Sequence, residues 1–135
     1  MPQTMDQKRA EYAWERVQEA AQNRIIDDYT REAKGAPALI MNSGLMQCLA
    51  FLCAKDKPQH LALLRHLCRW LGRNLGGTPL ARGNSFPLEQ VADFATVMAA
   101  LYTAPSFVYL RATDETLALL RWIRQFADAR KAMEG

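Results

Sequence analysis

The stretch PALIMNSGLMQCLAFLCA, residues 37–54, is apolar on nearly every side when it is wound as a helix. A helix of that kind has to be buried. Its eighteen residues are interrupted by polar side chains, which makes the stretch short and polar for a membrane span. We therefore predict an all-α protein, a single compact bundle of about five helices packed around a central helix at residues 37–54.

Small and polar residues in this stretch predict how the helix begins and packs. Gly35 suits the end of a preceding helix, and Pro37 suits a first helical position. Gly44 costs a helix about 1 kcal/mol relative to alanine, which predicts a closely packed neighbouring helix. Asn42 and Gln47 are expected to be hydrogen-bonded inside the core, because a buried unsatisfied amide costs about 1–3 kcal/mol. We interpret Asn42, Gly44 and Gln47 as a structural motif.

Four other segments have the spacing of apolar residues that is typical of amphipathic helices. They cover about residues 6–34, 58–74, 88–102 and 113–133. Thr113 is expected to be the N-cap of the last helix. Residues 107–110 are expected to be a connector, and residues 76–87, which contain two glycine signals and two prolines, a flexible loop.

Length and composition indicate one domain, residues 1–135, with half of its residues hydrophobic. The N-terminal residues are charged where a signal peptide needs an apolar run, so we expect a cytoplasmic protein without a membrane segment. The three cysteines are an odd number in apolar helical runs, which argues against disulfides.

Catalytic and metal-binding patterns are weak in this sequence. It contains no C-x-x-C and no H-x-x-x-H pair, so we predict neither a metal site nor a cofactor. A thiol enzyme that pairs Cys68 with His60 or His66 stays as an alternative, although His66 is expected on a helix surface. We predict that the protein is not an enzyme.

Positive charge is unevenly distributed, although the net charge is only +3. Arg65, Arg69 and Arg73 recur every four residues on one face of a predicted helix. The last predicted helix adds Arg121, Arg124 and Lys131. Such residues either form a solvated face or follow a phosphate backbone, which gives sequence-independent, salt-sensitive binding.

Two motifs resemble those of one known family. The first runs from Asn42-Ser43-Gly44-Leu45 through Gln47, Leu49, Ala50 and Phe51, and is similar to "N-G-L-x-Q-x-L-A-F". The second is similar to "Y-R-x-A-T-x-E-A-L-x-x-L-x-W-L-K-x-F-A" and includes Tyr109, Arg111, Ala112, Thr113, Glu115, Leu117, Leu120, Trp122, Phe126 and Ala127, with Trp70-Leu71 between the two motifs. Their combination and order resemble the small helical subunit of the type III-B (Cmr) CRISPR RNA-guided effector complex.

The resemblance implies a non-catalytic antiviral-defence subunit that stacks in several copies into an inner filament and helps to line the channel for guide RNA and target RNA. Its partners would be other Cmr subunits, copies of itself and RNA backbone. The six basic residues named above fit that function, and Trp70 and Trp122 fit the structural motif.

The alternative is a helical adaptor that binds a protein partner and no nucleic acid, such as a type III-A-like small subunit or a stand-alone regulator. An exposed patch containing Trp14, Trp70 or Trp122 would favour it.

Overall fold

The computed structural model describes residues 2–74 and 94–134 and confirms the all-α class. Its helices are α1 (Met5–Gln22), α2 (Ile26–Ser43), α3 (Leu45–Lys55), α4 (Pro58–Asn74), α5 (Phe94–Thr103) and α6 (Ser106–Glu134). The predicted loop at residues 76–87, and the first part of the helix predicted at residues 88–102, lie outside the described residues. The predicted helix at residues 58–74 is confirmed as α4.

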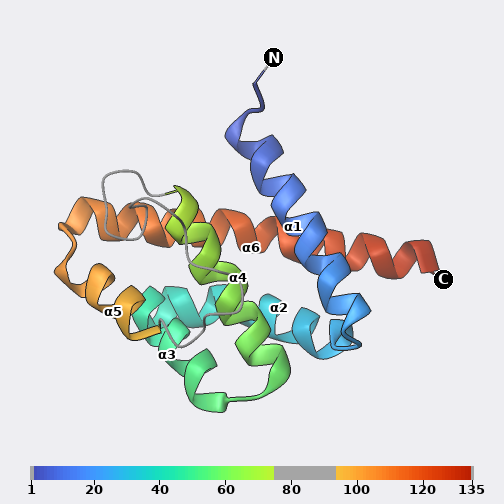
Figure 1. Ribbon diagram of the computed structural model, residues 1–135, viewed down its shortest axis with the longest axis horizontal. Coiled ribbons are helices and arrows are strands. Elements are labelled where there is room, and N and C mark those ends of the chain that lie inside the picture. The colour runs from blue at the N-terminus through green and yellow to red at the C-terminus, as the bar shows by residue number, and fades with distance from the viewer. Residues whose placement is uncertain (1, 75–93, 135) are drawn as a thin grey trace.

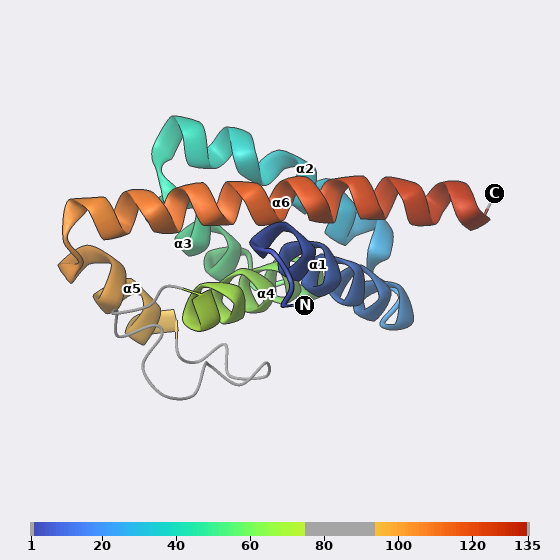
Figure 2. The same cartoon turned by 90° about the horizontal axis from the view of Figure 1, so that it is seen from above.

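The long helix α6 extends along the whole molecule, and α1, α2 and α4 pack against it (Figure 1). Its largest contacts are with α1 and α2. In Figure 2 the C-terminal half of α2 lies on one side of α6, and α1, α3 and α4 lie on the other. All six described helices contribute to the core, for example through Val17, Ile40, Leu49, Leu67, Val97 and Leu120. The core is therefore shared among the helices, with α2 and α4 each packing against α1, α3 and α6 as well as each other.

A bend at Gly44 divides residues 37–54 between α2 and α3, so the continuous central helix expected from the sequence is wrong. Gly44 has φ +94°, a backbone conformation that favours glycine. The hydroxyl of Tyr109 on α6 lies 3.5 Å from the position of a Cβ at Gly44. The same hydroxyl accepts a hydrogen bond of 3.2 Å from the backbone N–H of Met46, in the first turn of α3. Gly44 is thus needed mainly for the turn.

The residues that flank this bend also differ from expectation. Gly35 and Pro37 both lie inside α2, so neither marks a helix boundary. A proline removes one backbone donor from a helix interior, yet α2 continues through it. Asn42 and Gln47 are exposed to solvent, so their expected burial in the core is wrong. Their amides need no protein partner, because water can bind them.

The helix predicted at residues 6–34 is two helices, because a turn separates α1 from α2. Arg24 in that turn has φ 63°, in the left-handed region that non-glycine residues seldom adopt. Thr4 begins α1 with a capping box, in which its hydroxyl accepts from the N–H of Gln7 and the Gln7 side chain accepts from the N–H of Thr4. The two helices can therefore pack on different neighbours.

The helix α6 begins earlier than predicted, directly after Pro105. Residues 107–110 belong to it, so the expected connector is wrong. Thr113 is an interior residue whose hydroxyl donates to the carbonyl of Tyr109 at 3.1 Å, and it is not the N-cap. A hydroxyl bonded to the preceding turn is compatible with an uninterrupted helix.

Candidate nucleic-acid interface

Four arginines gather where α4 packs beside α1. Arg65, Arg69 and Arg73 follow one another at every turn of α4, whose opposite face buries leucines in the core. Arg16 of α1 joins them, since its guanidinium carbon lies 4.8 Å from the centre of the Tyr12 ring and that of Arg73 lies 5.7 Å from the same ring. We call Arg16, Arg65, Arg69 and Arg73 the arginine cluster. Two of its cations share one aromatic ring, which holds them through cation–π attraction.

Carboxylates are scarce around the arginine cluster. Arg16 lies 3.8 Å from both Glu15 and Glu19, while within the described residues the three arginines of α4 form no ion pair. The buried Nε atoms of Arg16 and Arg69 have no hydrogen-bond partner in the described part of the chain. Burial and the neighbouring Arg69 lower the pKa of Arg73. The cluster therefore has an excess of positive charge, which favours an anionic ligand.

The aromatic support beneath the cluster is fixed by packing and hydrogen bonds. Tyr12 is buried, its hydroxyl donates to the carbonyl of His66 at 2.6 Å, and its ring centre lies 4.8 Å from that of Trp70. Burial raises the pKa of Tyr12 to about 12, although Arg16 opposes the shift. The ring under the two guanidiniums is neutral at physiological pH and held in one place.

A second set of polar contacts joins α1 to α6. Arg9 donates to both carboxylate oxygens of Glu115, at 2.6 Å and 2.8 Å, and the indole N–H of Trp70 donates to the same carboxylate at 2.9 Å. Burial raises the pKa of Glu115, but the hydrogen bonds from Arg9 and Trp70 outweigh it and leave the pKa below the ordinary value. We call the side chains that join α1 to its neighbours the α1 seam: Arg9, Tyr12, Arg16 and Glu19 of α1, His66 and Trp70 of α4, and Glu115 of α6.

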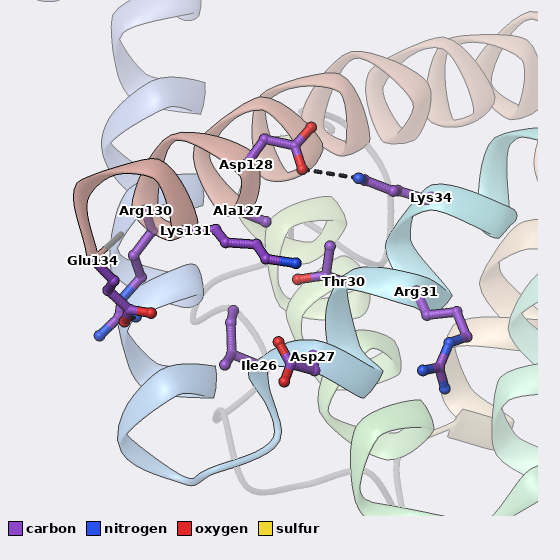
Figure 3. Close-up of a pocket in the computed structure, with 10 residues that line it drawn as sticks. All are labelled: Ile26, Asp27, Thr30, Arg31, Lys34, Ala127, Asp128, Arg130, Lys131 and Glu134. Atoms are coloured by element: carbon purple, nitrogen blue, oxygen red, sulfur yellow. Dashed lines mark hydrogen bonds and ion pairs between the residues drawn. The ribbon is translucent and has the colours of Figure 1, made fainter.

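The predicted basic residues of α6 lie on a different helix from those of the arginine cluster. Arg121, Arg124 and Lys131 are exposed, and Lys131 lines a groove of about 530 Å³ between α2 and α6. Figure 3 shows this groove, in which Lys34 reaches across from α2 to Asp128 of α6 at 2.8 Å. No residue of the arginine cluster lines it. Of the six basic residues predicted to meet RNA, Lys131 therefore lines a groove away from the arginine cluster, whereas Arg121 and Arg124 are exposed on α6 and do not line that groove.

Arg16 and Tyr12 were missed by sequence reasoning, because the mixed charges of residues 6–34 are typical of a solvated face. The available signal was the spacing of four residues between Tyr12 and Arg16, which places them on one side of a helix.

The structure does not favour the thiol enzyme that the sequence left as an alternative. Burial raises the pKa of the Cys68 thiol to about 12, with Cys53 adding to the shift, and burial raises that of Cys48 to about 11. A neutral buried thiol is a poor nucleophile. His66 is fully buried, so its expected position on a helix surface is wrong.

Within residues 2–74 and 94–134, no group of three or more His, Cys, Asp or Glu side chains is arranged to hold a metal ion. Over the same ranges, no helix combines the length and the apolar character that crossing a membrane requires.

Comparison with known proteins identifies the family. Residues 5–130 match the family described as CRISPR-associated protein (Cas_Cmr5). The chain is 32% identical over 126 residues to the CRISPR system Cmr subunit Cmr5 of Thermus thermophilus, which spans 93% of this chain and 95% of that protein. It is also similar to the crystal structure of a CRISPR-associated Cmr5 family protein from Thermus thermophilus, with a TM-score of 0.72 and 30% identity, over 95% of this chain and 97% of that one. The chain, with its six described helices and its arginine cluster, therefore belongs to the Cmr5 family of CRISPR-associated proteins.

Proposed function

We propose that this chain is a non-catalytic small subunit of a type III-B CRISPR RNA-guided effector complex that contacts the backbone of guide RNA or target RNA. In this proposal copies of the chain stack into an inner filament, bind other Cmr subunits, and act in the cytoplasm. The observation that supports RNA contact is the arginine cluster, in which the three arginines of α4 form no ion pair within the described residues.

The chemistry of the cluster suits phosphate better than bases. A planar guanidinium donates two parallel hydrogen bonds to a phosphate, and the spacing along α4 repeats such donors at every turn. In an RNA-guided complex the sequence is read by base pairing between guide and target, so the protein needs backbone contacts only. We infer that the arginine cluster supplies these contacts, and that Arg121, Arg124 and Lys131 add further contacts from α6.

The experiment that tests RNA contact is a salt series of fluorescence-anisotropy binding to a generic single-stranded RNA. Arg69→Gln with Arg73→Gln should weaken binding about tenfold at low salt and reduce the slope of log affinity against log salt by about 1.4, since each lost phosphate contact removes about 0.7. The matched control is Lys55→Gln with Lys57→Gln. It removes the same charge from two exposed residues at the turn between α3 and α4 that belong neither to the arginine cluster nor to the groove lined by Lys131, and should change the slope little.

An unchanged slope in the α4 variant would mean that the arginine cluster is only a solvated face. A third variant, Arg121→Gln with Arg124→Gln and Lys131→Gln, asks whether the basic residues of α6 take part. If the unmodified chain fails to bind RNA even at low salt, the isolated subunit supplies no phosphate contacts of its own, and the adaptor function is favoured.

The adaptor function has one observation in its favour. Tyr102, Phe107 and Leu110, where α5 meets α6, are 68%, 63% and 62% exposed. Exposed aromatic and aliphatic side chains are typical of protein interfaces. The tryptophan patch that would have favoured an adaptor is not exposed. Trp70 is buried and the Trp14 and Trp122 rings both pack on Phe126, with centroids 5.4 Å and 5.5 Å away.

Phe107→Ala with Leu110→Ala separates the two functions. If these side chains form a protein interface, the double variant should assemble poorly with the other Cmr subunits in co-sedimentation, while its RNA salt slope stays that of the unmodified chain. Unimpaired assembly would exclude this corner of the molecule as the main interface.

A further inference from the structure

A buried chain of hydrogen bonds joins three helices at one imidazole. Nδ1 of His66 on α4 lies 2.8 Å from the hydroxyl of Tyr29 on α2, and its Nε2 lies 2.7 Å from a carboxylate oxygen of Glu19 on α1. The side chains of Tyr29 and His66 are fully buried, whereas that of Glu19 retains 26% exposure. The backbone carbonyl of His66 also accepts from the hydroxyl of Tyr12. The proposed RNA contact does not make use of these hydrogen bonds.

The contacts determine which nitrogen of His66 bears the proton. A carboxylate accepts hydrogen bonds and donates none, so Nε2 must carry the hydrogen that faces Glu19. Nδ1 then has a lone pair and accepts from the hydroxyl of Tyr29. Every polar atom of the chain is satisfied when the imidazole is neutral, with this one tautomer.

We propose that the Tyr29–His66–Glu19 chain is a proton-sensitive latch that fastens α1 and α2 to α4, and that protonation of His66 loosens both helices. A second proton on the ring makes Nδ1 a donor, which then faces the donating hydroxyl of Tyr29. To accept from Nδ1, the hydroxyl must turn its own hydrogen away. In the described structure that hydrogen has no other acceptor within a fully buried site.

The charges around His66 come from each packed element. α1 contributes Glu19, Arg16 and the hydroxyl of Tyr12, α2 contributes Tyr29, and α4 itself contributes Arg65. Glu19 favours a charged imidazole, whereas Arg16 and Arg65 oppose it. The remaining histidine, His60, differs because its Nε2 lies 3.1 Å from Glu32 and its Nδ1 has no partner in the described residues. It therefore serves as an internal reference.

The buried position of His66 agrees with the direction in which its pKa is shifted. Burial lowers the pKa of His66, with Arg16 and Arg65 assisting, and the hydrogen bond and charge of Glu19 only partly offset this. The unfolded chain therefore binds a proton more readily than the native one. Stability contributed by His66 is complete above the ordinary histidine pKa of 6.5, and falls as the pH drops from there toward the lower native value.

The first test is an NMR titration of the two imidazoles in the full chain, with His60→Gln to assign the signals. His66 should show the tautomer with hydrogen on Nε2 and titrate below 6.5. Glu19→Gln keeps an acceptor but removes the charge, so it should lower the His66 titration further. A His66 titration at or above the ordinary value, or one that Glu19→Gln leaves unmoved, would overturn the latch. This titration needs no variant at His66 itself.

The second test is hydrogen exchange of backbone amides at pH 7.5 and pH 5.5, with intrinsic exchange rates divided out. Protection in α1 and α2 should fall by at most about tenfold between these two pH values, because the unfolded His66 titrates near 6.5 and the native one lower, and it should fall more than in α6. Tyr29→Phe should lower protection at both pH values, because it leaves Nδ1 of the buried His66 without its partner. The matched control is Tyr102→Phe, at an exposed tyrosine. Equal losses in every helix would indicate general acid unfolding, and would contradict a local latch.

Discussion

The α1 seam and the bend at Gly44 stabilise the same bundle by different means. In the seam, ionised and hydrogen-bonded side chains are partly withdrawn from water, and most of them depend on a partner far away in the sequence, as Arg9 depends on Glu115. At the bend, aliphatic core residues pack on both sides, and one backbone torsion at Gly44 determines the path of the chain. A change in the seam therefore removes a partner, whereas a change at the bend forces a strained conformation.

The largest expected effect is at the centre of the seam. Glu115→Ala should lower the free energy of unfolding by about 2–4 kcal/mol, because it removes the partner of the Trp70 N–H and leaves Arg9, which is only 19% exposed, with the exposed Asp6 as its one remaining carboxylate. Urea unfolding measures this. The matched control is Asp128→Ala, which breaks the exposed pair with Lys34 and should cost less than about 0.5 kcal/mol. Similar losses of stability in both variants would mean that the buried contacts of the seam stabilise the protein no more than an exposed ion pair does.

The next largest effect on stability is expected at the bend. Gly44→Leu should cost about 1–3 kcal/mol, because a leucine is strained at φ +94°. Thermal melting monitored by circular dichroism measures it. A variant that melts like the unmodified chain would refute the need for glycine at the bend.

A smaller effect isolates the hydrogen bond at the bend from its torsion. Tyr109→Phe keeps the ring but removes the acceptor of the Met46 N–H, so we expect a loss of about 1 kcal/mol in urea unfolding. Tyr102→Phe, on an exposed ring, is the control and should be neutral. If both variants are neutral, water replaces the tyrosine hydroxyl at the start of α3.

The smallest effect has the opposite sign. Gly35 lies inside α2 with open space around it, so Gly35→Ala should stabilise the protein by about 0.5–1 kcal/mol through helix propensity alone. The same substitution at Gly44 should destabilise. A loss of stability at Gly35 would show that α2 needs flexibility there.

The sequence predicted the helices where apolar spacing and boundary residues agree. α4 was found because regularly spaced leucines follow Pro58. The turn around Arg24 was not found, since it contains neither Gly nor Pro and relies on a left-handed arginine. Residues 37–54 were read as one helix because their apolar character continues across Gly44, and composition does not reveal a change of direction.

The candidate site was predictable to a similar extent. The α4 arginines follow from their spacing, which is a local property. Arg16 and the seam do not, because the partners of charged residues on α1 are fixed only when α4 and α6 are packed. Glu115, for example, binds Arg9 of α1 and Trp70 of α4, partners that its position in the sequence does not reveal. The His66 contacts were missed for the same reason, since α1 and α2 meet α4 only in the folded chain.

The unbroken helix α6 has a mechanical consequence. Its 29 residues contain neither glycine nor proline and measure about 43 Å at 1.5 Å per residue. Phe107 and Leu110 are near one end and Lys131 is near the other, so a rigid strut fixes their separation. In a stack of copies, a partner at one end of α6 would be held at a set distance from a partner at the other. The spacing between successive copies would then be set by the length of α6 and would not vary with the loops.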